Sequence, residues 1–132
     1  MPRREDGDVA RLKQVVVDCL HPASLARFWA VALDDFSIRA YDDAEVARLA
    51  EIGRTPETDP GVILDGPELE LCFQETGSPI TTKRTLHLDI ASVDRVGEVE
   101  RLSAMGATIV QTFDAHTWMR DPEGNDFCVT DR

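Results

Sequence analysis

Residues 117–130, TWMRDPEGNDFCVT, decide the fold of this chain. β-Prone residues stand on both sides of the Asp-Pro-Glu-Gly-Asn segment, so the stretch predicts a β-hairpin closed by a tight turn. Pro122 fixes its own φ for the first central turn position, and Gly124 together with Asn125 accepts positive φ. The motif alone is typical of a tight turn. It gains importance because a strand similar to the one that follows it also occurs earlier in the chain.

Alternation along the second strand of this hairpin separates two kinds of side chain. Successive side chains of a strand point to opposite faces, so Phe127 and Val129 share one face. Asp126, Cys128 and Thr130 share the other face. The apolar face must pack on a core, whereas a face of thiol, hydroxyl and carboxylate can line a cavity.

The composition excludes several classes of protein. A chain of 132 residues is long enough for one domain with a real core and too short for two ordinary ones. Fourteen Lys and Arg against 25 Asp and Glu give a net charge of −11, which repels phosphate backbones and acidic membranes. We therefore expect no nucleic-acid and no membrane partner. The sequence shows neither an apolar run of membrane-spanning length nor a secretory signal, which predicts a cytoplasmic location.

Three cysteines, Cys19, Cys72 and Cys128, cannot all pair with one another. Each lies in a strand-like run, which predicts reduced, buried thiols and not a disulfide framework. A reactive thiol needs a lowered pKa, and this acidic chain offers no obvious cationic neighbour. We therefore expect inert cysteines.

The first half of the chain predicts one long helix and several short elements. The helix starts near Pro22, and its apolar stripe contains Trp29, so core packing is favoured over a ligand platform for this indole. The expected elements are a flexible arm (1–11), a strand (12–20), the helix, a short strand (37–41), a helix capped at Asp42 and ended by Gly53, a loop (54–61) and two strands (62–64 and 69–74).

The second half repeats this order. After a connection over 75–83, we expect a strand (84–91), a helix from about Asp94 to Gly106, a strand (108–112) and the closing hairpin. In both halves the last strand contains an apolar-Cys-apolar triplet. An internal repeat of this size indicates two copies of one supersecondary unit, which would associate to bury their bare sheet faces.

The element order and three segments resemble the vicinal oxygen chelate superfamily, which includes glyoxalase I, bleomycin-resistance proteins and extradiol dioxygenases. The segments are RTLHLDI (84–90), EVERLSAMGA (98–107) and DPEGNDFCV (121–129), and residues 41–61 match the glyoxalase-like domain proteins in particular. The resemblance covers residues 12–131. It implies an α+β fold in which two βαβββ modules (about 12–76 and 84–131) form a cup-shaped mixed sheet with helices on the outside.

The same resemblance implies a single domain over 12–132, a homodimer and a small organic ligand in the cup. It also implies where metal-using members carry ligands, namely on the cup face of the first and last strand of each module. Those positions fall on Gln14 and Cys72 in the first module, and on Cys128 and His87 in the second, or on Thr85 in place of His87 if the loop carries no insertion. Hard divalent ions prefer histidine and carboxylates, although two thiolates and an imidazole could hold Zn²⁺. We therefore expect no cofactor, with a divalent metal at Gln14 and His87 as the alternative.

His87 is the candidate catalytic residue. Asp89 on the same strand face could orient it as a general base, or the two could form a hydrogen-bonded structural pair, and the sequence leaves both open. His116 lies near the hairpin mouth beside Trp118 and could touch a ligand, but we favour a surface residue that flanks the turn.

The carboxylates expected in the cup favour a polar or cationic ligand over a phosphate ester. The candidate ligand-binding residues are Gln14, Asp18, Glu70, Cys72, Gln74, Asp89, Trp118 and Cys128. Two classes of function follow: a lyase, isomerase or dioxygenase that uses His87, and a metal-free protein that binds or sequesters its ligand without converting it.

Overall fold

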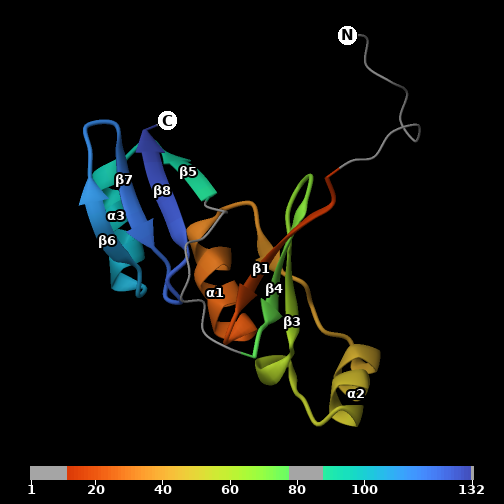
Figure 1. The fold of residues 1–132 in the computed structure, drawn as a ribbon. Coiled ribbons are helices and arrows are strands. Elements are labelled where there is room, and N and C mark those ends of the chain that lie inside the picture. Colours follow the sequence, from red (N-terminus) through yellow and green to blue (C-terminus); the bar gives the residue numbers. More distant parts are fainter. Residues whose placement is uncertain (1–11, 78–87, 132) are drawn as a thin grey trace.

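The computed structural model describes residues 12–77 and 88–131. In this part of the chain, two four-stranded mixed sheets are accompanied by three α-helices (Figure 1). The first module contains β1 (Gln14–Cys19), α1 (Pro22–Ala32), β2 (Ser37–Ile38), α2 (Asp43–Glu51), a 3-10 turn (Pro56–Thr58), β3 (Gly61–Asp65) and β4 (Glu70–Glu75). The second contains β5 (Leu88–Ser92), α3 (Arg95–Ala104), β6 (Thr108–Thr112), β7 (His116–Arg120) and β8 (Asp126–Asp131).

The two sheets have the same topology. The strand orders are β1-β4-β3-β2 and β5-β8-β7-β6, and in each sheet the first strand pairs in parallel with the last. The remaining neighbours pair antiparallel. The duplication and the α+β class expected from the sequence are therefore confirmed. Helix α2 and the 3-10 turn account for the greater length of the first module.

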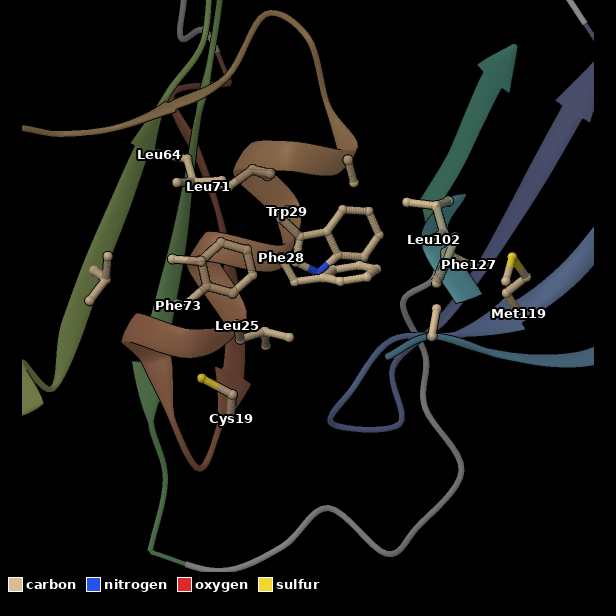
Figure 2. Close-up of a cluster of buried hydrophobic side chains, with 14 of the residues drawn as sticks. Cys19, Leu25, Phe28, Trp29, Leu64, Leu71, Phe73, Leu102, Met119 and Phe127 are labelled. Carbon is tan, nitrogen blue, oxygen red and sulfur yellow. The ribbon is translucent and has the colours of Figure 1, made fainter. Parts of the chain in front are cut away.

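Helix α1 carries the centre of the core. It begins at Pro22, and its apolar stripe is buried as predicted, with Trp29 2% exposed. In Figure 1, α1 lies between the two sheets. Figure 2 shows Phe28 and Trp29 beside Phe127 of β8, and the Trp29 and Phe127 ring centroids are 5.1 Å apart. One continuous hydrophobic cluster therefore joins both modules.

The turn between β7 and β8 has the expected geometry, with one difference. The Gly124 N–H donates to the Asp121 carbonyl at 2.8 Å, which puts Pro122 at the first central position, and Gly124 has φ 84°. The expectation of positive φ at Asn125 is wrong, because every described residue with positive φ is a glycine. Asn125 instead turns its side-chain amide onto the Asp121 carboxylate at 2.8 Å.

This turn also ties the two modules together. Asp121 is 3% exposed and accepts hydrogen bonds from the turn N–H groups of Glu123 and Asn125, each at 2.9 Å. It further accepts the indole N–H of Trp29 in α1, at 3.0 Å. The Glu123 carboxylate accepts the backbone N–H groups of Leu20 (2.5 Å) and His21 (2.8 Å), where β1 leads into α1. A sequence typical of a simple turn thus fixes one module on the other.

The alternation of faces along the strands is confirmed. Leu71 and Phe73 of β4 are buried, as are Phe127 and Val129 of β8, and the side chains between them lie on the opposite faces. The cysteines are free. The expectation of buried thiols is correct for Cys19 and wrong for Cys72 and Cys128, which are partly exposed.

The structure bears on the expected helix ends and not on the expected N-terminal arm. The arm over 1–11 and residues 84–87 of the predicted strand 84–91 lie outside the described residues. Helices α2 and α3 end before Gly53 and Gly106, as expected. None of the helices in the described ranges is long and apolar enough to cross a membrane.

Candidate functional site

The open face of the first sheet is organised in cross-strand rows. Strand register aligns Gln14 with Glu70 and Val16 with Cys72, and Cys72 in turn with Ile63. Val16 is 44% exposed, so the middle row is an apolar strip facing solvent. The row that contains Gln14 and Glu70 is polar.

That polar row is closed by internal contacts. The Gln14 amide donates to Glu70 Oε2 at 2.9 Å, and Arg39 Nη2 donates to Glu70 Oε1 at 2.6 Å. Arg39 also binds Asp65. The Arg39 guanidinium holds the pKa of the Asp65 carboxyl and that of the Glu70 carboxyl below their usual range. Both oxygens of Glu70 are therefore already occupied within the protein, and Gln14 and Glu70 form a structural pair.

The open face of the second sheet contains a cavity of about 290 Å³. Register places Trp118 beside Cys128, and His116 beside Thr130. The residues that line the cavity are Phe113, His116, Trp118, Asp126, Phe127 and Cys128. Pockets that bind small molecules are typically about 300–1,000 Å³ and largely apolar with a few polar groups, so this cavity has the composition of a small binding pocket.

One wall of the cavity is an aromatic pair formed by Phe113 of the β6–β7 connection and His116, the first residue of β7. The rings of Phe113 and His116 are stacked, with centroids 4.5 Å apart. Arg95, at the start of α3, holds this connection by donating to the backbone carbonyls of Phe113 (2.8 Å) and Asp114 (2.6 Å). The same guanidinium donates to Asp131 at the end of β8, at 3.0 Å. The wall is thus anchored to the helix and to the neighbouring strand.

The cavity lining also contains an indole and a carboxylate, Trp118 and Asp126. Asp126 Oδ1 accepts the indole N–H of Trp118 at 3.1 Å and Nε of Arg120 at 3.0 Å. The Arg120 guanidinium carbon lies 5.6 Å from the Trp118 ring centroid, within the range of a cation–π contact. These contacts fix the orientation of Trp118 against the strand.

The structure brings some of the predicted site residues together and separates others. Trp118 and Cys128 line the cavity, and Asp89 is aligned with Cys128 in the β5–β8 pair. The other described candidates lie on the first sheet: Gln14, Asp18, Glu70, Cys72 and Gln74. His87 and Thr85 lie outside the described residues. Of the two cysteines expected in one hollow, Cys128 lines this cavity and Cys72 lies on the other sheet.

Four of the residues that line the cavity were not among the predicted ligand-binding residues: Phe113, His116, Asp126 and Phe127. Alternation put Asp126 on the face of Cys128, which is a signal for it, and Phe127 was assigned to the core. His116 is partly exposed and stacks on Phe113, so it is a surface residue that also lines the cavity. Phe113 had no signal, because it lies in a connection without periodicity.

The donor atoms of the described residues do not fit a metal ion. Within 12–77 and 88–131, no group of three or more His, Cys, Asp or Glu side chains is close enough to hold one. Both Glu70 oxygens accept hydrogen bonds from the protein, and the Gln14 amide nitrogen donates to one of them. Burial, then the nearby carboxylates, raises the pKa of Cys72 and of Cys128 in the metal-free chain. His87 lies outside the described residues, so a divalent metal at Gln14 and His87 stays a prediction.

The raised pKa values of the three thiols predict slow alkylation of the cysteines. Burial raises the pKa of Cys19 to about 12, so roughly a thousandfold less thiolate exists there than in a free cysteine at the same pH. We expect iodoacetamide to modify Cys72 and Cys128 more slowly than a cysteine peptide at pH 8. Because thiolate increases as pH rises, the rates should still increase above pH 9. Cys19 should react only after unfolding. Peptide mass spectrometry gives each rate, and labelling of Cys128 at the peptide's rate at pH 7 would contradict the prediction.

The paired βαβββ modules with an open sheet face define a protein of the vicinal oxygen chelate superfamily. The family model described as glyoxalase-like domain matches residues 14–130, and the chain belongs to this family. No curated protein matches the chain significantly.

Solved structures share the fold at low sequence identity. A glyoxalase/bleomycin resistance protein/dioxygenase family enzyme from Burkholderia phytofirmans is 16% identical with a TM-score of 0.68, covering 92% of this chain and 98% of its own. A hypothetical protein from S. aureus is 14% identical (TM-score 0.66, 96% of both chains). The trypanothione-dependent glyoxalase I of Leishmania major is 17% identical (TM-score 0.63, 93% of this chain and 87% of its own). At such identities these likenesses concern the fold alone.

Proposed function

We propose that this protein binds a small organic molecule on the open face of its second sheet and does not convert it chemically. The observation that carries the proposal is the cavity of about 290 Å³ whose lining includes the stacked Phe113 and His116 rings and Trp118. Aromatic walls contribute apolar contact area at low entropic cost, and Asp126 supplies a polar group that would orient a ligand.

The chemistry of the described residues favours binding over catalysis. The thiol of Cys128 is a poor nucleophile because its pKa is raised by burial and by Asp89 and Asp126. Glu70, one of the candidate ligand-binding residues, is held by Arg39 and Gln14 and is not available as a base. The enzymatic alternative depends on His87 as a base or metal ligand, and it is an outcome of the tests below.

Indole is a suitable neutral probe for binding, because it is small and aromatic. In amide-resolved NMR of the full chain, we expect indole to shift the signals of the Trp118 side-chain N–H and of the backbone at 113, 116 and 128. Trp118→Ala should abolish these shifts, since it removes one wall of the cavity. Cys72→Ser, at the position of the first sheet that is equivalent to Cys128, is the control and should leave them unchanged. Loss of the shifts in Cys72→Ser, or their persistence in Trp118→Ala, would place the binding site elsewhere.

The alternative function is tested through His87. We expect the purified protein to contain no stoichiometric divalent metal and His87→Ala to bind indole as the wild type does. Elemental analysis and the same NMR titration measure both. A stoichiometric metal that is lost in His87→Ala would instead favour a lyase, isomerase or dioxygenase.

The proposal includes a homodimer and a cytoplasmic location. The apolar strip around Val16 on the open face of the first sheet supports an association of two copies, because such strips are commonly covered by a partner. Light scattering after gel filtration should give twice the chain mass of 14.7 kDa.

A further inference from the structure

We propose that the ligand of this cavity is an aromatic organic cation, which places its ring against Trp118 and its positive group on Asp126. This inference rests on the proposed function and adds the chemical class of the ligand to it. It follows from the shape of the cavity, from its carboxylate and from the cation that the protein itself already places there.

The aromatic lining of the cavity favours a small planar ligand. The stacked Phe113 and His116 rings and the Trp118 indole lie on the same cavity, so a planar ring can contact aromatic surface there. A cavity of about 290 Å³ has room for one or two rings. Aromatic rings present a negative face, which attracts a cation within about 6 Å of the centroid.

Asp126 supplies the negative charge. Its Oδ1 accepts from Trp118 and Arg120, and among residues 12–77 and 88–131 no hydrogen bond reaches its Oδ2. The side chain of Asp126 is 27% exposed, so a ligand in the cavity can approach it. A charged donor on a carboxylate forms a shorter and stronger hydrogen bond than a neutral one, which favours a cation over a neutral ligand.

Arg120 is an internal example of the same recognition. Its guanidinium lies over the Trp118 ring at 5.6 Å while its Nε donates to Asp126 at 3.0 Å. A planar cation is thus already accommodated by this indole and this carboxylate together. The Arg120 side chain is 48% exposed and is not among the residues that line the cavity, so its charge opposes a ligand cation without filling the site.

Most of the other charged groups near the cavity are acidic, and the guanidinium of Arg95, which holds the Phe113 wall, is paired with Asp131. Asp89 is aligned with Cys128 and acts on it electrostatically, and Cys128 is a protonated thiol. His116 is stacked on Phe113. The net charge of −11 adds a long-range attraction for cations that weakens with salt.

Three probes of nearly equal shape separate charge from shape: benzamidine (cation), benzamide (neutral) and benzoate (anion). We expect NMR titrations of the full chain at low salt to give benzamidine an affinity about tenfold above that of benzamide, with benzoate the weakest. The Trp118 indole N–H should report all shifts. Asp126→Asn keeps an oxygen for the Trp118 hydrogen bond, and it should bring benzamidine to within about threefold of benzamide. The control Asp114→Asn changes an exposed carboxylate away from the cavity lining and should keep the preference.

Arg120→Ala provides an independent second test. Because it removes the competing positive charge from Asp126, it should raise the ratio of the benzamidine affinity to the benzamide affinity severalfold. An unchanged or lower ratio would count against the inference. Equal binding of the three probes, or a preference for benzoate, would overturn the ligand class while indole binding keeps the proposed function intact. If neither the probes nor indole shift Trp118, both proposals fail.

Discussion

Asp121→Ala should lower the free energy of unfolding by about 3 kcal/mol or more. The carboxylate is 3% exposed and accepts four hydrogen bonds, from the Trp29 indole, from the backbone of Glu123 and from the backbone and side chain of Asn125. Removing it leaves a buried indole N–H and two turn N–H groups without their acceptor. A buried donor that loses its partner costs about 1–3 kcal/mol, which makes this loss large for a single turn residue.

Urea unfolding followed by circular dichroism measures the change. The matched control is Asp114→Ala, because the Asp114 side chain is exposed, and its effect should stay within about 0.5 kcal/mol. Trp29→Phe keeps an aromatic ring and removes the N–H, so a cycle with Asp121→Ala should show positive coupling between the two sites. A loss below about 1 kcal/mol in Asp121→Ala would mean that the turn does not join the modules energetically.

Phe127→Ala should cost about 3–5 kcal/mol, the range for deleting a buried phenylalanine ring. Phe127 of β8 is fully buried, and its ring centroid is 5.1 Å from that of Trp29 and 6.3 Å from that of Phe28 in α1. The substitution therefore opens a cavity at the contact between the modules, where the surrounding side chains belong to different sheets and cannot all collapse into it.

The same experiment tests whether the modules unfold together. Because one core cluster includes residues of both modules, we expect a single transition with coincident fluorescence and circular dichroism curves in the wild type. The control Phe113→Ala removes a ring that is 38% exposed and should cost less than about 1 kcal/mol. Two separate transitions in the wild type, or similar losses for the two phenylalanine variants, would contradict a shared core.

The sequence predicted most of the fold, because local patterns of apolar and polar residues determine most of its helices and strands. Alternation in LELCFQ and NDFCVT identified the buried faces of β4 and β8, and the stripe of α1 placed Trp29 in the core. The duplication followed from the repeated order of these patterns. Strand lengths differed by a few residues: the strand expected at 37–41 has only two residues, although the Arg39 N–H still donates to the Ile63 carbonyl of β3 at 2.9 Å.

The candidate site could be predicted only in part. Trp118 and Cys128 were found from alternation, since both lie in regular strands. Phe113 joins them through the β6–β7 connection, whose path is set by hydrogen bonds from Arg95, a residue 18 positions away. Gln14 and Glu70 looked like ligands in the sequence, and the structure shows them engaged with each other and with Arg39.

The sequence by itself determined the two modules, their order of elements and the side of each strand that faces the core, because periodicity along the chain is a property of neighbouring residues. Only the tertiary structure decided that Asp121 and Glu123 bind the closing turn to α1 and to the residues before it. It also decided that the two open sheet faces differ: Arg39 occupies Glu70 on the first, and the second contains a cavity beside Trp118. These features depend on contacts between residues up to 103 positions apart, and no local pattern records which distant donor a carboxylate will meet.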